Sequence, residues 1–389
     1  MRRLAAVPIS LVASILVAGG QASAAVALSW TTQTTLNPAG TSSDNELFGV
    51  SCPGARACTA VGYYDIPSGR ATNGLAERWN GSVWAVQTLP KPTGARSYRM
   101  FGVSCASTTV CTAVGSYDNS SKVVVTLAER WNGGHWAIQP TPAPSVATFS
   151  QFTGVSCPTP SACIAVGFYQ TSDPGADVGF SETWNGSTWT IHTVPEPPDF
   201  ERGELLGVSC KSAIACMAVG YYNTESVYSL LPLTAFWNGS VWTLESMPLP
   251  AGSNTGEAEG VSCPSATSCT AVGFWVTSAD VNNPLVERWN GSAWTVQSIS
   301  DPGVTAGLDS VSCPTSNDCT AVGTYATSSA DLPLAERWNG SAWSSQTTPN
   351  PFADTFPYGV SCSAATSCTA VGFDYDTSSD GYLTVALRY

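Results

Sequence analysis

Two acidic residues, Glu259 and Asp309, are the side chains whose types and positions point most directly to chemistry. Each directly precedes a copy of one repeated segment, Gly-Val-Ser-Cys in the first case and Ser-Val-Ser-Cys in the second, so they hold equivalent places in neighbouring repeats. Two neighbouring carboxylates can serve as acid and base or nucleophile in glycoside hydrolysis, or they can bind Ca²⁺ with loop carbonyls. They can equally be solvated acids on an acidic protein.

Aromatic residues supply the candidates for ligand contact. Phe48, Phe101 and Tyr358 stand directly before other copies of the same segment, where they would form an aromatic mouth. Trp275 is the one tryptophan outside a repeated pattern, and it can stack on a sugar or simply pack. Further acids lie in the same stretches of the repeats: Asp44, Glu46, Glu204, Glu257, Asp374 and Asp376.

The repeats that must position these residues dominate the chain. A run of Gly-Val-Ser-Cys, five residues and Cys-x-Ala-Val-Gly occurs seven times, with one Gly→Ser change at Ser310. Each unit of roughly 50 residues contains four strand-like runs, which in the first unit are 49–52, 58–64, 75–79 and 83–88. Asn80-Gly81 between the last two predicts a type I′ hairpin turn. Seven four-stranded antiparallel units predict an all-β, seven-bladed β-propeller with almost no helix.

The two ends of the chain predict how the ring closes. The seventh unit stops at Tyr389 without its fourth strand, and the segment 28–34 matches that missing strand. We therefore expect the N-terminal strand to complete blade seven, with Tyr389 where the other blades have a tryptophan. Closure of this kind removes an exposed sheet edge.

The fourteen cysteines fall into seven Cys-x₅-Cys pairs, each flanking the turn between the first two strands of a unit. A structural zinc needs four ligands, and no pair has a third Cys or a His nearby, so the pattern favours disulfides over metal binding. No cysteine is left as a free thiol, and no metal or cofactor is expected. The predicted disulfides are Cys52–Cys58, Cys105–Cys111, Cys157–Cys163, Cys210–Cys216, Cys263–Cys269, Cys313–Cys319 and Cys362–Cys368.

Tryptophan pairs such as Trp79 and Trp84 flank each Asn-Gly turn or its equivalent. We expect them to form diagonal cross-strand pairs that fill the wedges between blades, with a sugar-binding platform as the alternative. The acids that precede the first tryptophan are expected to make contacts between blades. They are Glu77, Glu129, Glu182, Glu287 and Glu336.

Connections in such a blade alternate between the two faces of the ring. The disulfide turn and the Asn-Gly turn share one face and keep a constant length, whereas the other two connections share the opposite face and vary. Because binding and catalysis usually reside on loops carried by a rigid scaffold, the variable face is the expected working face.

Composition bounds the compartment and the partners. The net charge of −13 argues against nucleic-acid binding, and only two histidines argue against a centre that needs several imidazoles. Residues 1–24 have the pattern of a secretory signal peptide, with Met1-Arg2-Arg3, an apolar stretch and Ala22-Ser23-Ala24. We therefore expect residues 25–389 to be a single propeller domain that is secreted, monomeric and without a membrane span.

In architecture, residues 25–389 resemble secreted bacterial seven-bladed propellers of the kelch and galactose-oxidase-like kind. The kelch diglycine is replaced by Val61-Gly62-Tyr63-Tyr64. His135 is placed in a turn and His192 in an outer strand, which does not fit the copper site that this resemblance implies. The sialidase Ser-x-Asp-x-Gly-x-Thr-Trp box is absent from the sequence.

These observations predict an exported binding module that recognises a glycan, a cell-wall component or an extracellular protein through its variable face. The alternative is a carboxylate-dependent, glycan-cleaving enzyme that uses Glu259 and Asp309 at the channel mouth. A purely structural or adhesive surface module is a third possibility, which would lack a pocket there.

Overall fold

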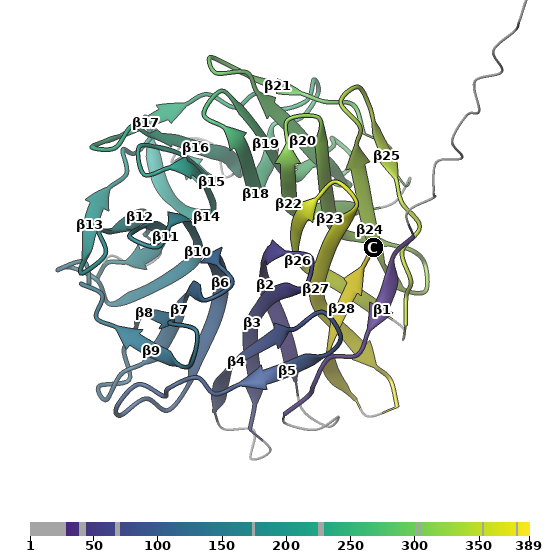
Figure 1. Ribbon diagram of the computed structural model, residues 1–389. Coiled ribbons are helices and arrows are strands. Elements are labelled where there is room, and N and C mark those ends of the chain that lie inside the picture. The colour runs from purple at the N-terminus through teal and green to yellow at the C-terminus, as the bar shows by residue number, and fades with distance from the viewer. Residues whose placement is uncertain are drawn as a thin grey trace, which may run out of the picture.

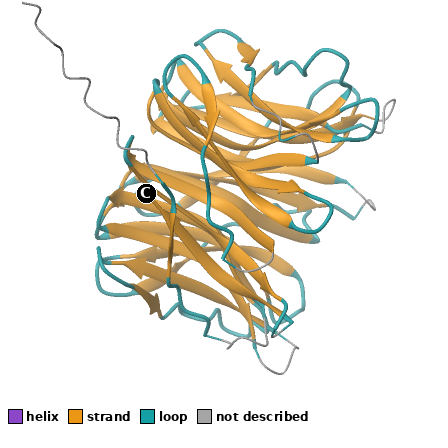
Figure 2. Cartoon of the chain, turned by 90° about the vertical axis from the view of Figure 1, so that its right-hand side faces the viewer, coloured by secondary structure: helices purple, strands orange, loops and turns teal. Residues whose placement is uncertain are grey.

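The computed structural model describes residues 29–38, 44–66, 71–172, 176–224, 229–299, 302, 305–351, 354–378 and 380–389. The predicted signal peptide lies outside these residues. The described chain forms seven four-stranded antiparallel sheets arranged as blades around a central channel (Figure 1). No helix occurs in the described part, and loops lie at both faces of the disc (Figure 2). The predicted all-β, seven-bladed propeller is confirmed.

The strands of each blade follow one another from the channel outward. Blades 1 to 3 are β2 (Asn45–Gly54), β3 (Ala57–Asp65), β4 (Thr72–Trp79), β5 (Trp84–Gln87); β6 (Tyr98–Ser107), β7 (Val110–Asp118), β8 (Val124–Trp131), β9 (Trp136–Gln139); and β10 (Phe149–Thr159), β11 (Ala162–Gln170), β12 (Asp177–Trp184), β13 (Trp189–Thr193). Blades 4 to 6 are β14 (Phe200–Ser212), β15 (Ala215–Thr224), β16 (Leu231–Trp237), β17 (Trp242–Glu245); β18 (Thr255–Ser265), β19 (Ser268–Val276), β20 (Asn282–Trp289), β21 (Trp294–Val296); and β22 (Ala306–Thr315), β23 (Asp318–Ala326), β24 (Asp331–Trp338), β25 (Trp343–Ser345). Blade 7 is β26 (Asp354–Ala364), β27 (Ser367–Asp376), β28 (Gly381–Arg388) and β1 (Thr31–Gln33).

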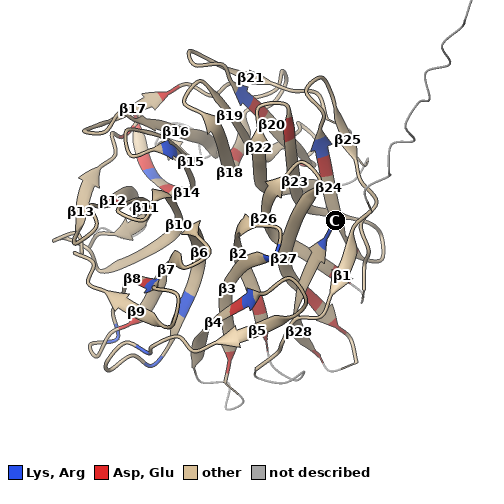
Figure 3. Cartoon of the chain, in the orientation of Figure 1, with Lys and Arg blue, Asp and Glu red and all other residues tan. Residues whose placement is uncertain are grey.

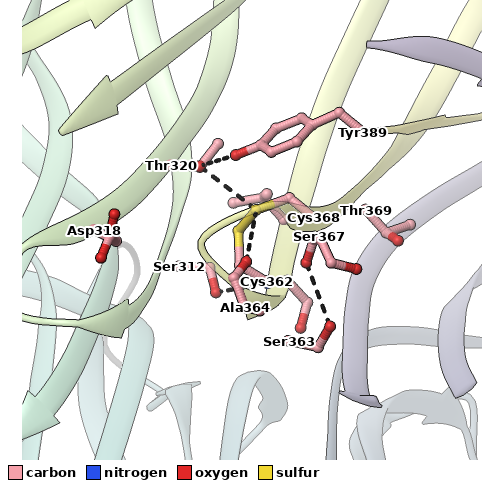
Figure 4. The surroundings of a disulfide bond; sticks show 12 residues. Ser312, Asp318, Thr320, Cys362, Ser363, Ala364, Ser367, Cys368, Thr369 and Tyr389 are labelled. Atoms are coloured by element: carbon pink, nitrogen blue, oxygen red, sulfur yellow. Dashed lines mark hydrogen bonds between the residues drawn. A yellow bond between two sulfur atoms is a disulfide. The ribbon is translucent and has the colours of Figure 1, made fainter. Parts of the chain in front are cut away.

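Blade 7 joins the two ends of the chain, as the sequence predicts. The N-terminal strand β1 pairs antiparallel with β28, with Thr32 opposite Leu387 (Figure 1). Tyr389 takes the place of the missing tryptophan and packs edge-on against Trp30 at a centroid distance of 4.5 Å. Its hydroxyl lies 2.6 Å from the hydroxyl of Thr320 in blade 6 (Figure 4). The closed ring therefore leaves blade 7 with the same four strands as its neighbours.

The serine of each Gly-Val-Ser-Cys segment links one blade to the next, a role that the sequence analysis did not assign. Its hydroxyl accepts a hydrogen bond from the backbone N–H of the first cysteine in the following blade, at 2.9 Å in all seven cases. The bond from Cys362 to Ser312 is one of them (Figure 4). Seven equivalent bonds thus form a closed circle around the channel. The accepting serines are Ser51, Ser104, Ser156, Ser209, Ser262, Ser312 and Ser361.

All seven predicted disulfides are present, and each joins the first and second strands of one blade. No free cysteine occurs among the described residues. The bonds are Cys52–Cys58, Cys105–Cys111, Cys157–Cys163, Cys210–Cys216, Cys263–Cys269, Cys313–Cys319 and Cys362–Cys368.

The tryptophan hairpins correct two details of the prediction. Trp79 and Trp84 are directly opposite partners, not a diagonal pair. The hairpin loop therefore has four residues, and in blade 1 only Gly81 has a positive φ, of 98°, so the turn is not type I′. The side-chain oxygen of Asn80 accepts hydrogen bonds from the backbone N–H groups of Ser82 and Val83, and these bonds stabilise the loop. The paired rings are buried, with centroids 5.5 to 5.9 Å apart in the six complete pairs.

The repeated glutamates are buried near the blade interfaces, and their hydrogen bonding differs between blades. Glu77 accepts a hydrogen bond from the N–H of Leu36. The position equivalent to Leu36 is proline ahead of blades 2, 3 and 5, and proline has no N–H to donate. Within the described chain the carboxyl oxygens there have no hydrogen-bond partner. These unpartnered carboxyl groups belong to Glu129, Glu182 and Glu287.

The order of strands confirms the predicted division into two faces. The disulfide turns and the tryptophan hairpin loops lie on one face, here called the fixed face, and the remaining connections lie on the opposite, variable face. Over the described residues, no helix with the length and apolar character of a membrane span is found.

Candidate functional site at the channel mouth

A β-bulge in every innermost strand turns one residue toward the channel. The register of β18 against β19 shifts between Ala258 and Gly260, which leaves Glu259 as the extra residue. A bulge leaves its additional residue unpaired and re-aims that side chain. Asp309 holds the same place in β22. The complete set of bulge residues is Phe48, Phe101, Thr153, Leu206, Glu259, Asp309 and Tyr358.

The glycine after each bulge lets neighbouring blades approach closely. A Cβ on Gly207 would lie 2.9 Å from the carbonyl oxygen of Glu259, and one on Gly260 would lie 2.9 Å from that of Asp309. A side chain at these positions would push the blades apart. Ser310 is the exception, and its hydroxyl accepts a hydrogen bond from the N–H of Val360 at 3.2 Å. The repeated Gly-Val-Ser-Cys segment therefore sets the spacing of the inner strands.

Six of the seven bulge residues line a cavity of about 230 Å³. Seven valines, one from each innermost strand, also line the cavity. They lie farther from the variable face than the bulge residues do. Glu259, Asp309, Phe48 and Tyr358 line the cavity as expected. Phe101 is not among the lining residues, but it packs edge-on against Phe48 at 5.8 Å. Charged residues are sparse over the ring and include acids on the strands around the channel (Figure 3).

Acidic side chains from blades 4, 5 and 6 gather on one side of the channel. Burial and the nearby Glu259 raise the pKa of Asp309 to about 8. Burial and the charge of Glu259 raise the pKa of Glu257 to about 9, and Glu257 donates a hydrogen bond to Glu259. Burial also raises the pKa of Glu259, while the hydrogen bond from Glu257 lowers it. At neutral pH the cluster therefore holds protons on Asp309 and Glu257.

Tyrosines extend the acidic side toward the variable face. The hydroxyl of Tyr221 donates a hydrogen bond to Glu204 at 2.6 Å. Burial raises the pKa of Glu204, and that hydrogen bond partly opposes the rise. A similar pair forms in blade 1, where burial raises the pKa of Glu46 to about 7 and Tyr63 donates a hydrogen bond to it. Sequence reasoning ranked these glutamates second, although their positions two residues before the bulge residues would have identified them.

Aromatic side chains form the other side of the channel. Phe48 lies 5.3 Å from Tyr358 and stacks on Tyr63 at 5.5 Å, measured between ring centroids. Tyr358 stacks in turn on Phe373 at 5.3 Å. The guanidinium of Arg99 lies 4.7 Å above the ring of Tyr63. Aromatic side chains from blades 7, 1 and 2, together with Glu46, thus form one side of the channel mouth, and acids from blades 4, 5 and 6 form the other.

Trp275 is not brought to this site. It lines a separate cavity of about 270 Å³ together with Pro250 and the outer strands of blade 5. Its neighbours there include Asn283, Val286 and Ile299. A ligand in the channel would therefore not contact Trp275.

The described residues contain no group of three or more His, Cys, Asp or Glu side chains placed to hold a metal ion. His135 lies in a hairpin loop and His192 in the outer strand β13, so the two histidines do not share a site. The channel presents carboxyl groups with raised pKa values beside aromatic rings. Such a set can hold a cationic group, or it can transfer a proton.

Comparisons with known proteins identify the fold but not a family. No known family profile matches the chain, and no curated protein matches it in sequence. Among solved structures, it is similar to YCF48 bound to D1 peptide, with 12% identity, 92% of this chain and 98% of the other covered, and a TM-score of 0.53. YCF48 from Cyanidioschyzon merolae gives 14% identity, 93% and 98% coverage, and a TM-score of 0.51. A protein of unknown function from Dyadobacter fermentans gives 8% identity, 93% and 98% coverage, and a TM-score of 0.50. These identities are low enough that the likeness concerns the fold alone.

Proposed function

We propose that the protein is an exported binding module that receives a cationic side chain of an extracellular polypeptide at the channel mouth. The observation that carries this proposal is the division of the channel wall into an acidic side and an aromatic side. A lysine side chain combines an ammonium group with an apolar stem. It would place its charge beside Glu259 and Asp309 and its methylenes against Phe48 and Tyr358.

The size of the cavity supports a side chain as the ligand. Its volume of about 230 Å³ lies below the range of roughly 300 to 1,000 Å³ typical of small-molecule sites. A saccharide chain would have to remain at the entrance. A propeller of the same architecture, YCF48, is bound to a peptide, so the fold is compatible with such a ligand. Seven disulfides suit an oxidising, extracellular setting.

A glycan-cleaving enzyme is the second candidate, favoured by two carboxyl groups from neighbouring blades that line one cavity. Asp309, whose pKa burial raises to about 8, would be the acid, and Glu259 would be its partner. A pair of carboxyl groups is the arrangement that most glycosidases use. The narrow cavity and the position of Trp275 outside it argue for binding instead.

The test is a calorimetric titration of the mature protein with peptides that carry one lysine, or acetyl-lysine at the same place. We expect saturable binding of the lysine peptide and a loss of at least tenfold, about 1.4 kcal/mol, on acetylation. The double variant Glu259→Gln/Asp309→Asn should lose the same preference. Asp318→Asn removes an acid from the fixed face and serves as the matched control. Equal binding of both peptides would contradict the proposal.

A further inference from the structure

A slot between adjacent blades, open at the fixed face, is filled by arginine at four places around the ring. The arginine directly before the first tryptophan of one blade, or before Tyr389 in blade 7, reaches over the first tryptophan of the next blade. Arg78 lies 4.7 Å from the ring centroid of Trp131, and Arg288 lies 4.5 Å from that of Trp338. The other two cases are Arg130 over Trp184 at 5.7 Å and Arg388 over Trp79 at 4.7 Å.

Each of these arginines also donates a hydrogen bond to the disulfide turn of the following blade. Arg78 donates to the carbonyl of Thr108 at 2.7 Å, and Arg288 donates to that of Ser316 at 2.7 Å. The remaining acceptors are the carbonyls of Pro160 and Ala55. The slot thus has two fixed components, an indole face and a backbone carbonyl, which together suit a planar guanidinium.

The slot between blades 3 and 4 lacks its arginine. Thr183 stands at that position, and a cavity of about 370 Å³ lies where the guanidinium would be. Its lining includes Trp184 and Trp237, and none of the lining residues among those described is Lys or Arg. The cavity opens between exposed turns at Ser161 and Asn185 on the fixed face. Its volume falls within the usual range for ligand sites, roughly 300 to 1,000 Å³.

The side chains around this cavity make contacts that differ from those in the arginine-filled slots. The indole N–H of Trp237 donates a hydrogen bond to the carbonyl of Ala213 at 3.2 Å. That carbonyl is at the position which accepts from arginine in the filled slots, and its second lone pair remains available. His192 packs edge-on against Trp237 at 4.8 Å, with its Nε2 2.8 Å from the hydroxyl of Thr183. One wall of the slot is therefore fixed while its centre stays empty of side chains.

The other positions without this arginine–tryptophan pair are closed differently. Phe236 replaces arginine in blade 4 and packs with the buried cluster that contains Trp289. In blade 6, Arg337 faces Tyr389 in place of tryptophan and pairs with Asp318 at 3.7 Å. Among the described residues, the slot between blades 3 and 4 thus combines a tryptophan that has no arginine over it with a cavity. Trp237 itself is only 3% exposed, because His192 packs against it.

We propose that the slot between blades 3 and 4 binds the guanidinium group of an arginine side chain carried by another polypeptide. The guest would stack on Trp237 and donate to the carbonyl of Ala213, as the chain's own arginines do at four equivalent places. This site lies on the fixed face, so it is distinct from the channel mouth and goes beyond the function proposed there. The protein as a whole has more acidic than basic residues and a net charge of −13, which favours the approach of a basic segment.

The experiment uses the mature protein and a short peptide with a single arginine, compared with the citrulline and lysine versions. Calorimetry should show one site for the arginine peptide, with at least tenfold weaker binding of both other peptides. Free arginine amide should also bind at least tenfold more weakly than the peptide. Equal binding of citrulline or lysine would overturn recognition of a guanidinium, and equal binding of arginine amide would overturn a polypeptide source.

Two substitutions test the slot without removing a buried group. Thr183→Arg restores the pattern of the other blades and should reduce binding at least tenfold, whereas the control Asp318→Asn, which lies on the fixed face outside the slot, should leave binding within about threefold of wild type. Arg288→Thr uncovers Trp338 and should raise the stoichiometry from one site to two. Binding unchanged by Thr183→Arg, or a single site in Arg288→Thr, would overturn the proposal.

The series is repeated in the Glu259→Gln/Asp309→Asn background, which removes the two channel carboxyl groups. Binding at the slot should persist there within about threefold. Loss of arginine binding in this background would assign it to the channel and overturn the slot, while leaving the channel proposal intact. The two proposals therefore fail by different results.

Discussion

The hydroxyl of Ser361 in blade 7 accepts a hydrogen bond from the backbone N–H of Cys52 in blade 1, at 2.9 Å. This bond closes a circle whose other six members join consecutive blades. Ser361→Ala leaves the Cys52 N–H without that acceptor, so we expect a loss of about 1 to 3 kcal/mol in unfolding free energy. Chemical denaturation should give the same loss for Ser51→Ala. An effect at Ser51 without one at Ser361 would mean that the ring does not close as described.

The disulfide staples should stabilise each blade separately. A seven-residue closed loop contributes about 2 kcal/mol on the chain-entropy estimate. The double variant Cys52→Ala/Cys58→Ala should therefore lower the unfolding free energy by about that amount and leave six disulfides by mass spectrometry under non-reducing conditions. A variant with wild-type stability would contradict this expectation. It would show that strand pairing alone holds the blade and that the disulfide adds no stability.

The buried glutamates should make the protein more stable in mild acid than at alkaline pH. Burial raises the pKa of Glu129 to about 9 and that of Glu182 to about 8. A carboxyl whose pKa is higher in the folded state contributes full stability below its unfolded value, near 4.5, and loses it as pH rises toward the folded value. The melting temperature should fall between pH 5 and pH 8, and Glu129→Gln, neutral throughout, should reduce that slope. A melting temperature that rises over this range would contradict the burial of these groups as acids.

Glycan cleavage should be absent. A screen of the mature protein against diverse oligosaccharides should release no new reducing ends, because the cavity admits a side chain and not a sugar chain. Glycan cleavage by the wild type that is lost in Glu259→Gln but kept in Asp318→Asn would contradict the proposed binding function. It would support the glycosidase alternative instead.

The sequence predicts the fold well because its repeats mark each structural requirement. Paired cysteines identify the first hairpin, and the match of 28–34 to the missing strand identifies the closure. The position before Gly-Val-Ser-Cys also located Glu259 and Asp309 correctly, since all seven blades carry the same bulge. The register of a pleated strand alone would not predict that bulge.

Other features depend on contacts between blades, which no single repeat encodes. The slot between blades 3 and 4 arises because Thr183 stands where four other blades have an arginine that reaches over the next blade, and repeat alignment shows the substitution but not the cavity. Trp275 was singled out because it departs from the pattern. Its position on β19 places it on the side of the blade, away from the channel. The hairpin loop of four residues likewise follows from the direct pairing of the tryptophans.

The central claim is tested most directly by the pH dependence of lysine-peptide binding at the channel. Burial holds the pKa of Asp309 at about 8, and a bound ammonium group favours the ionised carboxylate. Binding must therefore release protons below that pH, and affinity should increase roughly fivefold or more between pH 6 and pH 8.5. Titrations at both pH values should show this increase in wild type and its loss in Glu259→Gln/Asp309→Asn. An affinity that is independent of pH, or that falls over this range, would contradict a cation site built from these carboxyl groups.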